Sequence, residues 1–269
     1  MGIIYSIVIL LACILGAIVG LGGGVFIRPI FDAIGYHNVL NIAFFSSSAI
    51  LTMAVVSTVM KVRDGTKIEA KLALLISVGA VVGGMLGDQL LQLLVGRFEY
   101  DASVQRIQII ATVIVLVLSL IFTAKNNLRY IIKNRWVCLP LGVLLGTIAA
   151  FLGIGGGPIN VPILMIFFGL PIKTATGYSI VIIFFSHASR LITMGVTQAG
   201  QGEYSLFDAP LLRLLPFIII AAALGGFLGA YFSKIFSDKV VKKLFIAALL
   251  AVMVLNIYNA VVIVLDKLG

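Results

Sequence analysis

The chain has 269 residues, of which 61% are hydrophobic and only 11% are charged, and its mean hydropathy is +1.20. A water-soluble domain of this length needs more charge on its surface, so the composition indicates an integral membrane protein. The net charge is +9 at pH 7, but the Lys and Arg residues lie in short connections between apolar segments, where cytoplasmic retention explains them. We therefore expect no nucleic-acid partner.

Eight apolar segments are predicted when about 20 residues are allowed for one span. No Lys or Arg precedes the first segment and no clear cleavage site follows it, so it is predicted to stay in the membrane. The first and fifth segments are too long and too rich in glycine to be ordinary spans. In chain order the segments are 3–31, 39–60, 72–95, 104–124, 136–169, 174–194, 209–232 and 240–265.

The first and fifth segments carry the same motif of glycines and a proline. Gly20-Leu-Gly-Gly-Gly24 with Pro29 recurs as Gly153-Ile-Gly-Gly-Gly157 with Pro162, an offset of 133 residues. Each interior glycine costs a helix about 1 kcal/mol relative to alanine, and each proline removes a backbone donor. The motif therefore predicts that both helices break.

A second glycine pair shows that the whole chain is duplicated. Gly83 and Gly87 match Gly225 and Gly229 at an offset of 142, and their small-residue spacing is typical of closely packed membrane helices. The nine extra residues of the second half are expected in the polar loop at 198–208. We expect a first membrane repeat at 1–124, a cytoplasmic connector at 125–135 and a second membrane repeat at 136–269.

The distribution of basic residues predicts how the segments cross the membrane. If all eight cross once, the two sides collect 11 and 8 of the 19 Lys and Arg residues. If the two glycine-broken segments return to the side they came from, the count is 13 against 6, with both termini outside. We therefore predict an all-α polytopic membrane protein of ten helical pieces. It has two inverted-topology repeats, each with one broken helix pair and three spanning helices.

A half-helix that starts at the glycines directs free N–H groups and the positive end of its dipole into the break, where an anion is favoured. The predicted binding residues are Gly22, Gly23, Gly24, Gly155, Gly156 and Gly157, whose bare backbone lets an oxyanion approach. The alternative is that these glycines only let helices touch.

Polar residues near the two motifs extend this predicted site. The hydroxyls can donate to an oxyanion or bond back to their own helix, and the arginines can bind an anion or reach the outer interface. Asn160 can orient a ligand or fill backbone vacancies. The candidates are Arg28, Ser46, Ser47, Asn160, Thr176, Ser179 and Arg190.

Two further ionisable residues fall within predicted spans. His187 has a pKa range suited to proton coupling, although a packed, hydrogen-bonded histidine is the simpler interpretation. Asp88, after Gly87, is expected close enough to an interface to be solvated. Cys13 and Cys138 show no metal-ligand spacing, and the spans contain no catalytic constellation. We expect no metal, no cofactor and no enzyme activity.

The segments GLGGGVFIRPI at 20–30 and FLGIGGGPINVPILMIFFGLPIKTATGYS at 151–179 resemble the TauE/SafE family of sulfite and sulfonate exporters. The resemblance covers both halves. It implies a secondary transporter of small sulfur-containing anions in the bacterial inner membrane, where the lipid bilayer and an anionic substrate are its partners. Val25 stands where the second copy has Pro158, so we expect an asymmetric pocket.

The leading hypothesis is export by alternating access, with one repeat rocking against the other around a midplane site. Two alternatives stay open: a channel with a static glycine-loop filter, or a permease for a different small anion.

Overall fold

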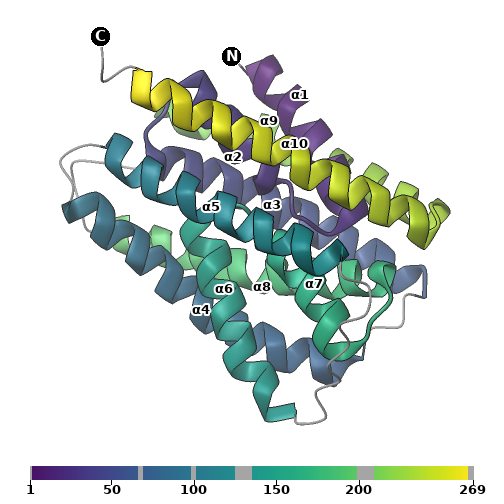
Figure 1. Cartoon of the computed structure of the whole chain (residues 1–269). Helices are drawn as coiled ribbons and strands as arrows, with labels where there is room; N and C mark the ends of the chain where they lie inside the picture. The colour runs from purple at the N-terminus through teal and green to yellow at the C-terminus, as the bar shows by residue number, and fades with distance from the viewer. Residues whose placement is uncertain (1, 66–68, 98–100, 125–134, 199–208, 266–269) are drawn as a thin grey trace.

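The computed structural model describes residues 2–65, 69–97, 101–124, 135–198 and 209–265, and within them the chain is helical (Figure 1). Within these residues six helices are long and apolar enough to span a membrane, so the protein is an all-α polytopic membrane protein as the sequence predicts. The α-helices are α1 (Gly2–Val19), α2 (Gly24–Ile34), α3 (Val39–Arg63), α4 (Ala70–Arg97), α5 (Asp101–Ala124), α6 (Cys138–Leu152), α7 (Gly157–Phe168), α8 (Ile172–Gln198), α9 (Ala209–Ile235) and α10 (Asp238–Leu265), and a short 3-10 helix, Arg135–Val137, precedes α6.

Both predicted helix breaks are present. α1 ends at Val19 and α2 begins at Gly24, while α6 ends at Leu152 and α7 begins at Gly157. The chain between them turns through left-handed backbone conformations that favour glycine, with φ of 75° at Gly22 and 88° at Gly155. The ten α-helices of the described residues therefore include two broken pairs, α1–α2 and α6–α7.

Both broken pairs return to the end of the molecule from which they start. α2 and α7 have 11 and 12 residues, which gives about 18 Å of helix against a hydrocarbon core of about 30 Å. The rings of Tyr5 in α1 and His37 after α2 lie 5.8 Å apart, so the first pair begins and ends together. For the second pair, Lys61 and Lys173 line one cavity and therefore lie on one side of the membrane. Eight single crossings would place these two lysines on opposite sides of the membrane.

The two halves of the sequence are interlocked rather than side by side. α4 packs on α6 and α8 of the second half, and α9 packs on α1 and α3 of the first (Figure 1). A Cβ on Gly83 would collide with the carbonyl oxygen of Val143, and a Cβ on Gly225 would stand 2.8 Å from the carbonyl oxygen of Leu10. Leu10 and Val143 are themselves matched by the repeat, at its offset of 133 residues. Glycine at these positions therefore lets the helix backbones touch, as the small-residue spacing predicts.

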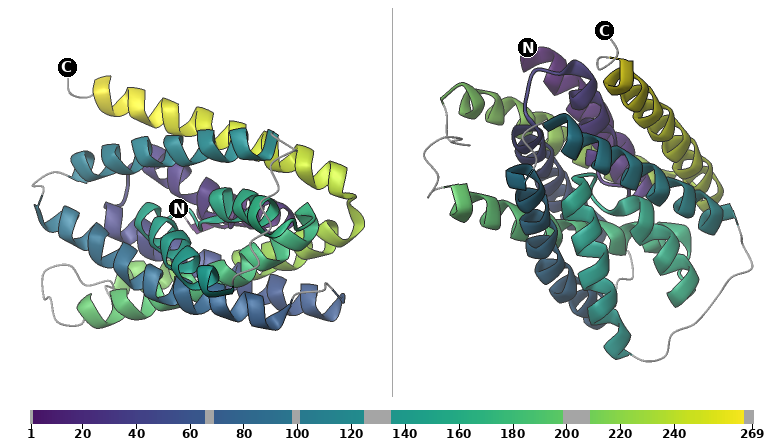
Figure 2. Two further views of the ribbon diagram at one scale, coloured as in Figure 1. Left: turned by 60° about the horizontal axis from the view of Figure 1, so that its bottom comes forward. Right: turned by 60° about the vertical axis from the view of Figure 1, so that its left-hand side comes forward.

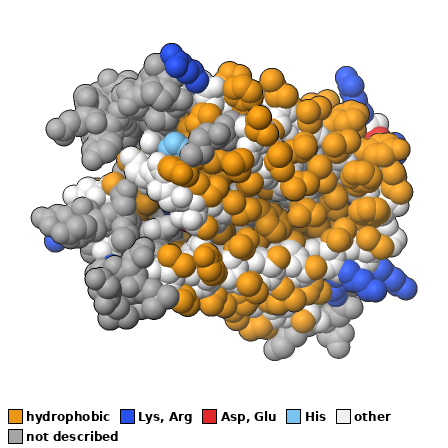
Figure 3. All heavy atoms as spheres, turned by 90° about the horizontal axis from the view of Figure 1, so that it is seen from above, with side chains coloured by type: hydrophobic (Ala, Val, Ile, Leu, Met, Phe, Trp, Pro, Cys, Tyr) orange, Lys and Arg blue, Asp and Glu red, His pale blue; other side chains and the backbone are white. Residues whose placement is uncertain are grey.

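The two breaks and the short helices α2 and α7 lie inside the molecule, and apolar side chains cover its outside. Figure 2 (left) shows α6 and α7 between α5 and α4, and α5 also lies along α10. On the face drawn in Figure 3, hydrophobic side chains form a broad area with Lys and Arg at its margins. This distribution suits a protein surrounded by lipid. Residues 125–134 of the predicted connector, and residues 199–208 of the loop expected to hold the extra residues, lie outside the described residues.

Candidate functional site

The two helix breaks meet at the centre of the fold. A Cβ on Gly22 would stand 3.3 Å from the Cα of Gly155, and a Cβ on Gly155 would stand 3.3 Å from the Cα of Gly22. Each break is held by a hydroxyl at matched positions of the repeat. Ser46 in α3 donates to the carbonyl of Gly153 at 3.1 Å, and Ser179 in α8 donates to the carbonyl of Gly20 at 2.7 Å. These bonds satisfy backbone acceptors that the unwound segments leave without helical partners.

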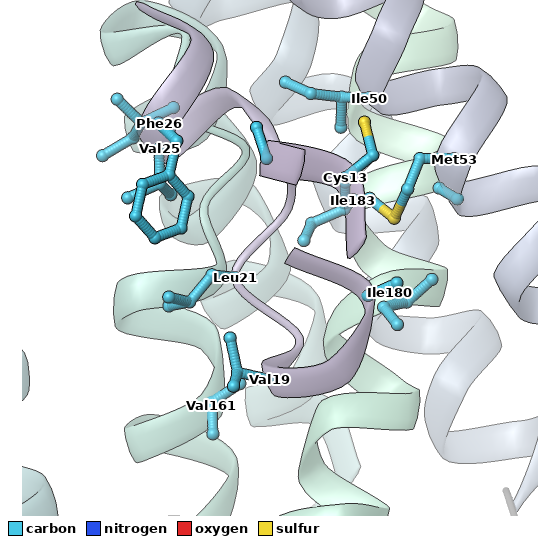
Figure 4. Close-up of a cluster of buried hydrophobic side chains, with 14 of the residues drawn as sticks. Cys13, Val19, Leu21, Val25, Phe26, Ile50, Met53, Val161, Ile180 and Ile183 are labelled. Carbon is cyan, nitrogen blue, oxygen red and sulfur yellow. The ribbon is translucent and has the colours of Figure 1, made fainter. Parts of the chain in front are cut away.

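The surroundings of the first break are apolar. Figure 4 shows side chains from α1, α2, α3, α7 and α8 packed around the unwound segment. Leu21, Val25 and Ile183 are completely buried there. Polar groups near the breaks are therefore in a medium of low dielectric, where each unpaired donor or charge is costly. The labelled residues are Cys13, Val19, Leu21, Val25, Phe26, Ile50, Met53, Val161, Ile180 and Ile183.

Arg28 is buried one turn into α2 and points toward the second break. Its Nε lies 3.7 Å from a carboxylate oxygen of Asp32, and its Nη2 donates to the side-chain oxygen of Gln108 in α5. The Gln108 amide nitrogen donates in turn to the carbonyl of Phe151, at 2.6 Å, near the end of α6. Gln108 thus fixes the guanidinium beside the end of α6. The interface location considered for Arg28 from sequence is wrong, because 3% of the residue is exposed.

Arg190 in α8 is buried close to Arg28, near the end of α6. Its Nε lies 3.4 Å from a carboxylate oxygen of Asp88 in α4, and its Nη1 donates to the hydroxyl of Ser47 at 3.1 Å. The Nδ1 of His187 lies 3.2 Å from the same hydroxyl. The interface locations considered for Arg190 and expected for Asp88 are both wrong, since each residue is fully buried. A buried Arg190 requires a buried counter-charge, and α4 supplies it because it packs on α8.

The two arginines converge on the backbone of Gly153. A Cβ on this glycine would stand 2.6 Å from Nη1 of Arg28 and 3.3 Å from Nη1 of Arg190. Among the described residues, Nη1 of Arg28 and Nη2 of Arg190 are buried without a hydrogen-bond partner, as is Nε2 of His187. Two neighbouring guanidinium groups, each with one nitrogen that lacks a partner, are suited to bind an oxyanion, whose oxygens accept several N–H groups at once.

Two predicted hydroxyls lie on the other side of the meeting point. Thr176 packs on Gly20, whose Cβ would stand 2.7 Å from the Thr176 Cα, and its hydroxyl accepts from Nζ of Lys61 at 3.4 Å. Ser179 binds the Gly20 carbonyl as described. The predicted site residues therefore form two groups, one at each break. Arg28, Ser46, Ser47 and Arg190 surround Gly153, whereas Thr176 and Ser179 surround Gly20.

The predicted glycines themselves lie against the backbone or the side chains of other residues, Ile50 being nearest to a Cβ on Gly24. A Cβ on Gly24 would stand 2.9 Å from the Gly153 carbonyl oxygen, and one on Gly157 would collide with Leu21. Gly23 lies against Cys13, with 2.9 Å from its Cβ position to the sulfur, and Gly156 lies against Ala149. The glycines thus allow the close approach considered as the alternative. Their binding of an anion stays a prediction.

Asn160 is the one predicted amide, and it lies in the first turn of α7. It is completely buried, and in the described part of the chain neither its amide nitrogen nor its amide oxygen has a hydrogen-bond partner. Buried amides normally form such bonds, so Asn160 could bind an ordered water or a polar ligand, and its contact with a substrate stays a prediction.

Sequence reasoning did not select three polar residues that the fold brings to the breaks. Asp32 and Gln108 contact Arg28, and Lys61 contacts Thr176. An acidic residue one helical turn after a membrane-depth arginine is a signal for Asp32. Lys61 was counted only as a topological charge, and Gln108 shows no signal in the sequence because α5 is far from α2 along the chain.

The chain matches one known family over nearly its whole length. The profile of the sulfite exporter TauE/SafE family matches residues 5–256, which include both glycine motifs and all the polar residues described above. No curated protein and no solved structure matches the chain significantly. A match over residues 5–256 of 269 shows the family, and the resemblance identified from the two glycine motifs is correct. The chain belongs to the TauE/SafE sulfite exporter family.

Proposed function

We propose that the protein is a secondary transporter that exports small sulfur-containing anions, such as sulfite or organosulfonates, across the bacterial inner membrane. The observation that carries the proposal is the convergence of Arg28 and Arg190 on Gly153, with buried, unpartnered nitrogens on both guanidinium groups. An anion bound there would accept from these nitrogens. It would also lower the cost of two like charges held close together in a low-dielectric site.

We propose that the interior-negative membrane potential drives this export. A singly charged anion that leaves the cell moves down the electrical gradient, which contributes about 2.3 kcal/mol per charge at 100 mV. Proton coupling at His187, whose Nδ1 lies 3.2 Å from the Ser47 hydroxyl that Arg190 also contacts, stays a prediction.

Alternating access around this site requires two rigid bodies that move against each other. We retain inverted repeats at 1–124 and 136–269 with a connector at 125–135 as the proposed organisation. Because glycine contacts fix α4 to α6, and α9 to α1, whole sequence halves are poor rigid bodies. The bodies that move would be mixed, with α1, α3 and α9 in one and α4, α6 and α8 in the other.

The test keeps the charge of each arginine and removes its planar fork. In proteoliposomes that contain the purified protein, labelled sulfite should exchange against internal sulfite. Arg28→Lys or Arg190→Lys should raise the half-saturating sulfite concentration about tenfold or more. Arg213→Lys, at an exposed arginine near the start of α9, should match wild type. Exchange without trans-stimulation would favour a channel, and unchanged half-saturation in both variants would refute the proposed site.

A further inference from the structure

A cationic cavity lies at the opposite side of the meeting point from the two arginines. It has a volume of about 330 Å³ and lies where the ends of α3 and α9 meet the start of α8. At about 30 Å³ per water molecule, this is room for roughly ten waters, or for a small oxyanion with part of its hydration. Its polar lining consists of Lys61, Asp64, Lys173, Thr174, Ser233 and Lys234.

The charges of this cavity are unbalanced. Lys234 pairs with Asp64 at 2.6 Å, which leaves Lys61 and Lys173 without a carboxylate among the lining residues. Lys61 is buried, with 6% of it exposed, and its Nζ donates only to two neutral hydroxyls, Ser233 at 3.1 Å and Thr176 at 3.4 Å. Within the described residues Lys61 has no ion-pair partner. A buried ammonium without a counter-charge is costly, and an anion in the cavity would remove that cost.

The cavity lies between the surface and the meeting point of the breaks. At its outer end the Lys234 side chain is 60% exposed. At its inner end Lys61 contacts Thr176, which packs on Gly20. The first break touches the second at Gly22 and Gly155, and the arginines lie beyond, at Gly153. Two groups of cationic donors thus lie on opposite sides of the glycine meeting point.

The repeat does not account for Lys61. The residue 133 positions later is Met194, which is buried and apolar, so the second half has no equivalent lysine. Ser46 and Ser179, which bind the two breaks, occur in both halves at matched positions. Lys61 occurs in the first half alone. The presence of a buried lysine at this position therefore has to be explained by the cavity that it lines.

We propose that the Lys61 cavity is a second oxyanion site, in which a sulfite-like or sulfonate group binds near the surface before it reaches the arginines. Nζ of Lys61 is the inner donor, Lys173 adds positive charge nearer the mouth, and the Ser233 hydroxyl holds the ammonium in place. The inference rests on the proposed transport of small anions, but it assigns residues that the arginine site does not use.

The test measures labelled sulfite uptake into proteoliposomes as a function of sulfite concentration at fixed ionic strength. Lys61→Met copies the residue found at the matched position of the other half. We expect it to raise the half-saturating concentration about tenfold or more while leaving the maximal rate within about twofold of wild type. Lys239→Met removes an exposed charge at the start of α10 and should leave half-saturation unchanged.

The outcomes separate this inference from the proposed function. If wild type transports sulfite and Lys61→Met has the same half-saturation, the second site is refuted and the arginine site stands. If wild type neither transports nor binds sulfite, both proposals fail. If Lys61→Met does not fold, Lys173→Gln carries the test, because this partly exposed residue is not needed for packing. We expect it to raise half-saturation about twofold to fivefold, and no change would overturn the inference.

Discussion

Replacing Gly153 with alanine tests the arginine site at the point where the two guanidinium groups converge. The new methyl group would stand 2.6 Å from Nη1 of Arg28 and 3.3 Å from Nη1 of Arg190, which is where a bound oxyanion has to reach both. Gly153 also has a φ of 65°, in the left-handed region, so alanine adds strain of about 1–2 kcal/mol. The substitution therefore lowers stability and blocks the ligand.

A matched control separates these two effects. Gly35 has a φ of 71° and no atom within 4 Å of its Cβ position, so Gly35→Ala introduces the same strain without filling any site. Both variants should lose about 1–2 kcal/mol of folding free energy from strain. Only Gly153→Ala should lose the response to anion.

The assay is thermal unfolding of the purified protein in detergent with sulfite, against chloride at equal ionic strength. At a sulfite concentration of about 100 times Kd, binding stabilises wild type by about 2.7 kcal/mol, or roughly 5–10 °C in Tm. Gly35→Ala should keep this shift and Gly153→Ala should lose most of it. A full shift in Gly153→Ala would refute the placement of the anion between the two arginines.

Three further predictions concern stability, and Tm measures each of them. Ser46→Ala and Ser179→Ala each remove the donor to a carbonyl of one break, and each should cost about 1–2 kcal/mol; a loss near zero would mean that the breaks are held in another way. Gly83→Ala would force α4 away from α6 and cost about 1–3 kcal/mol, whereas Gly96→Ala, with open space around its Cβ position, should be neutral or stabilising by up to about 1 kcal/mol. Burial lowers the pKa of His37, in the turn before α3, from its ordinary value of 6.5. The unfolded chain therefore binds the proton first, and stability falls as pH drops from about 7 toward 5. His37→Phe keeps the ring contacts and cannot titrate, so its Tm should fall less over this range, and an equal fall in both proteins would contradict the assignment.

The sequence by itself determined the helices, the two breaks and the family. Composition and length predict spans because lipid offers backbone groups no partners, so each segment has to form its own helix. The breaks are equally local, since consecutive glycines and a proline act on the residues around them. The repeat placed Ser46 and Ser179 at matched positions, but the sequence did not predict that they donate to the carbonyls of Gly153 and Gly20 in the opposite half.

Only the tertiary structure decided which charges meet. Asp88 was expected at an interface, yet α4 crosses to the other half and buries it against Arg190, 102 residues further along the chain. Gln108 reaches Arg28 across 80 residues. Such contacts depend on which helices pack together, and this is set by glycine faces that fit the backbone of a distant partner. Helix formation is local and could be predicted from sequence, whereas the site is made by interlocked helices whose pairing no local pattern contains.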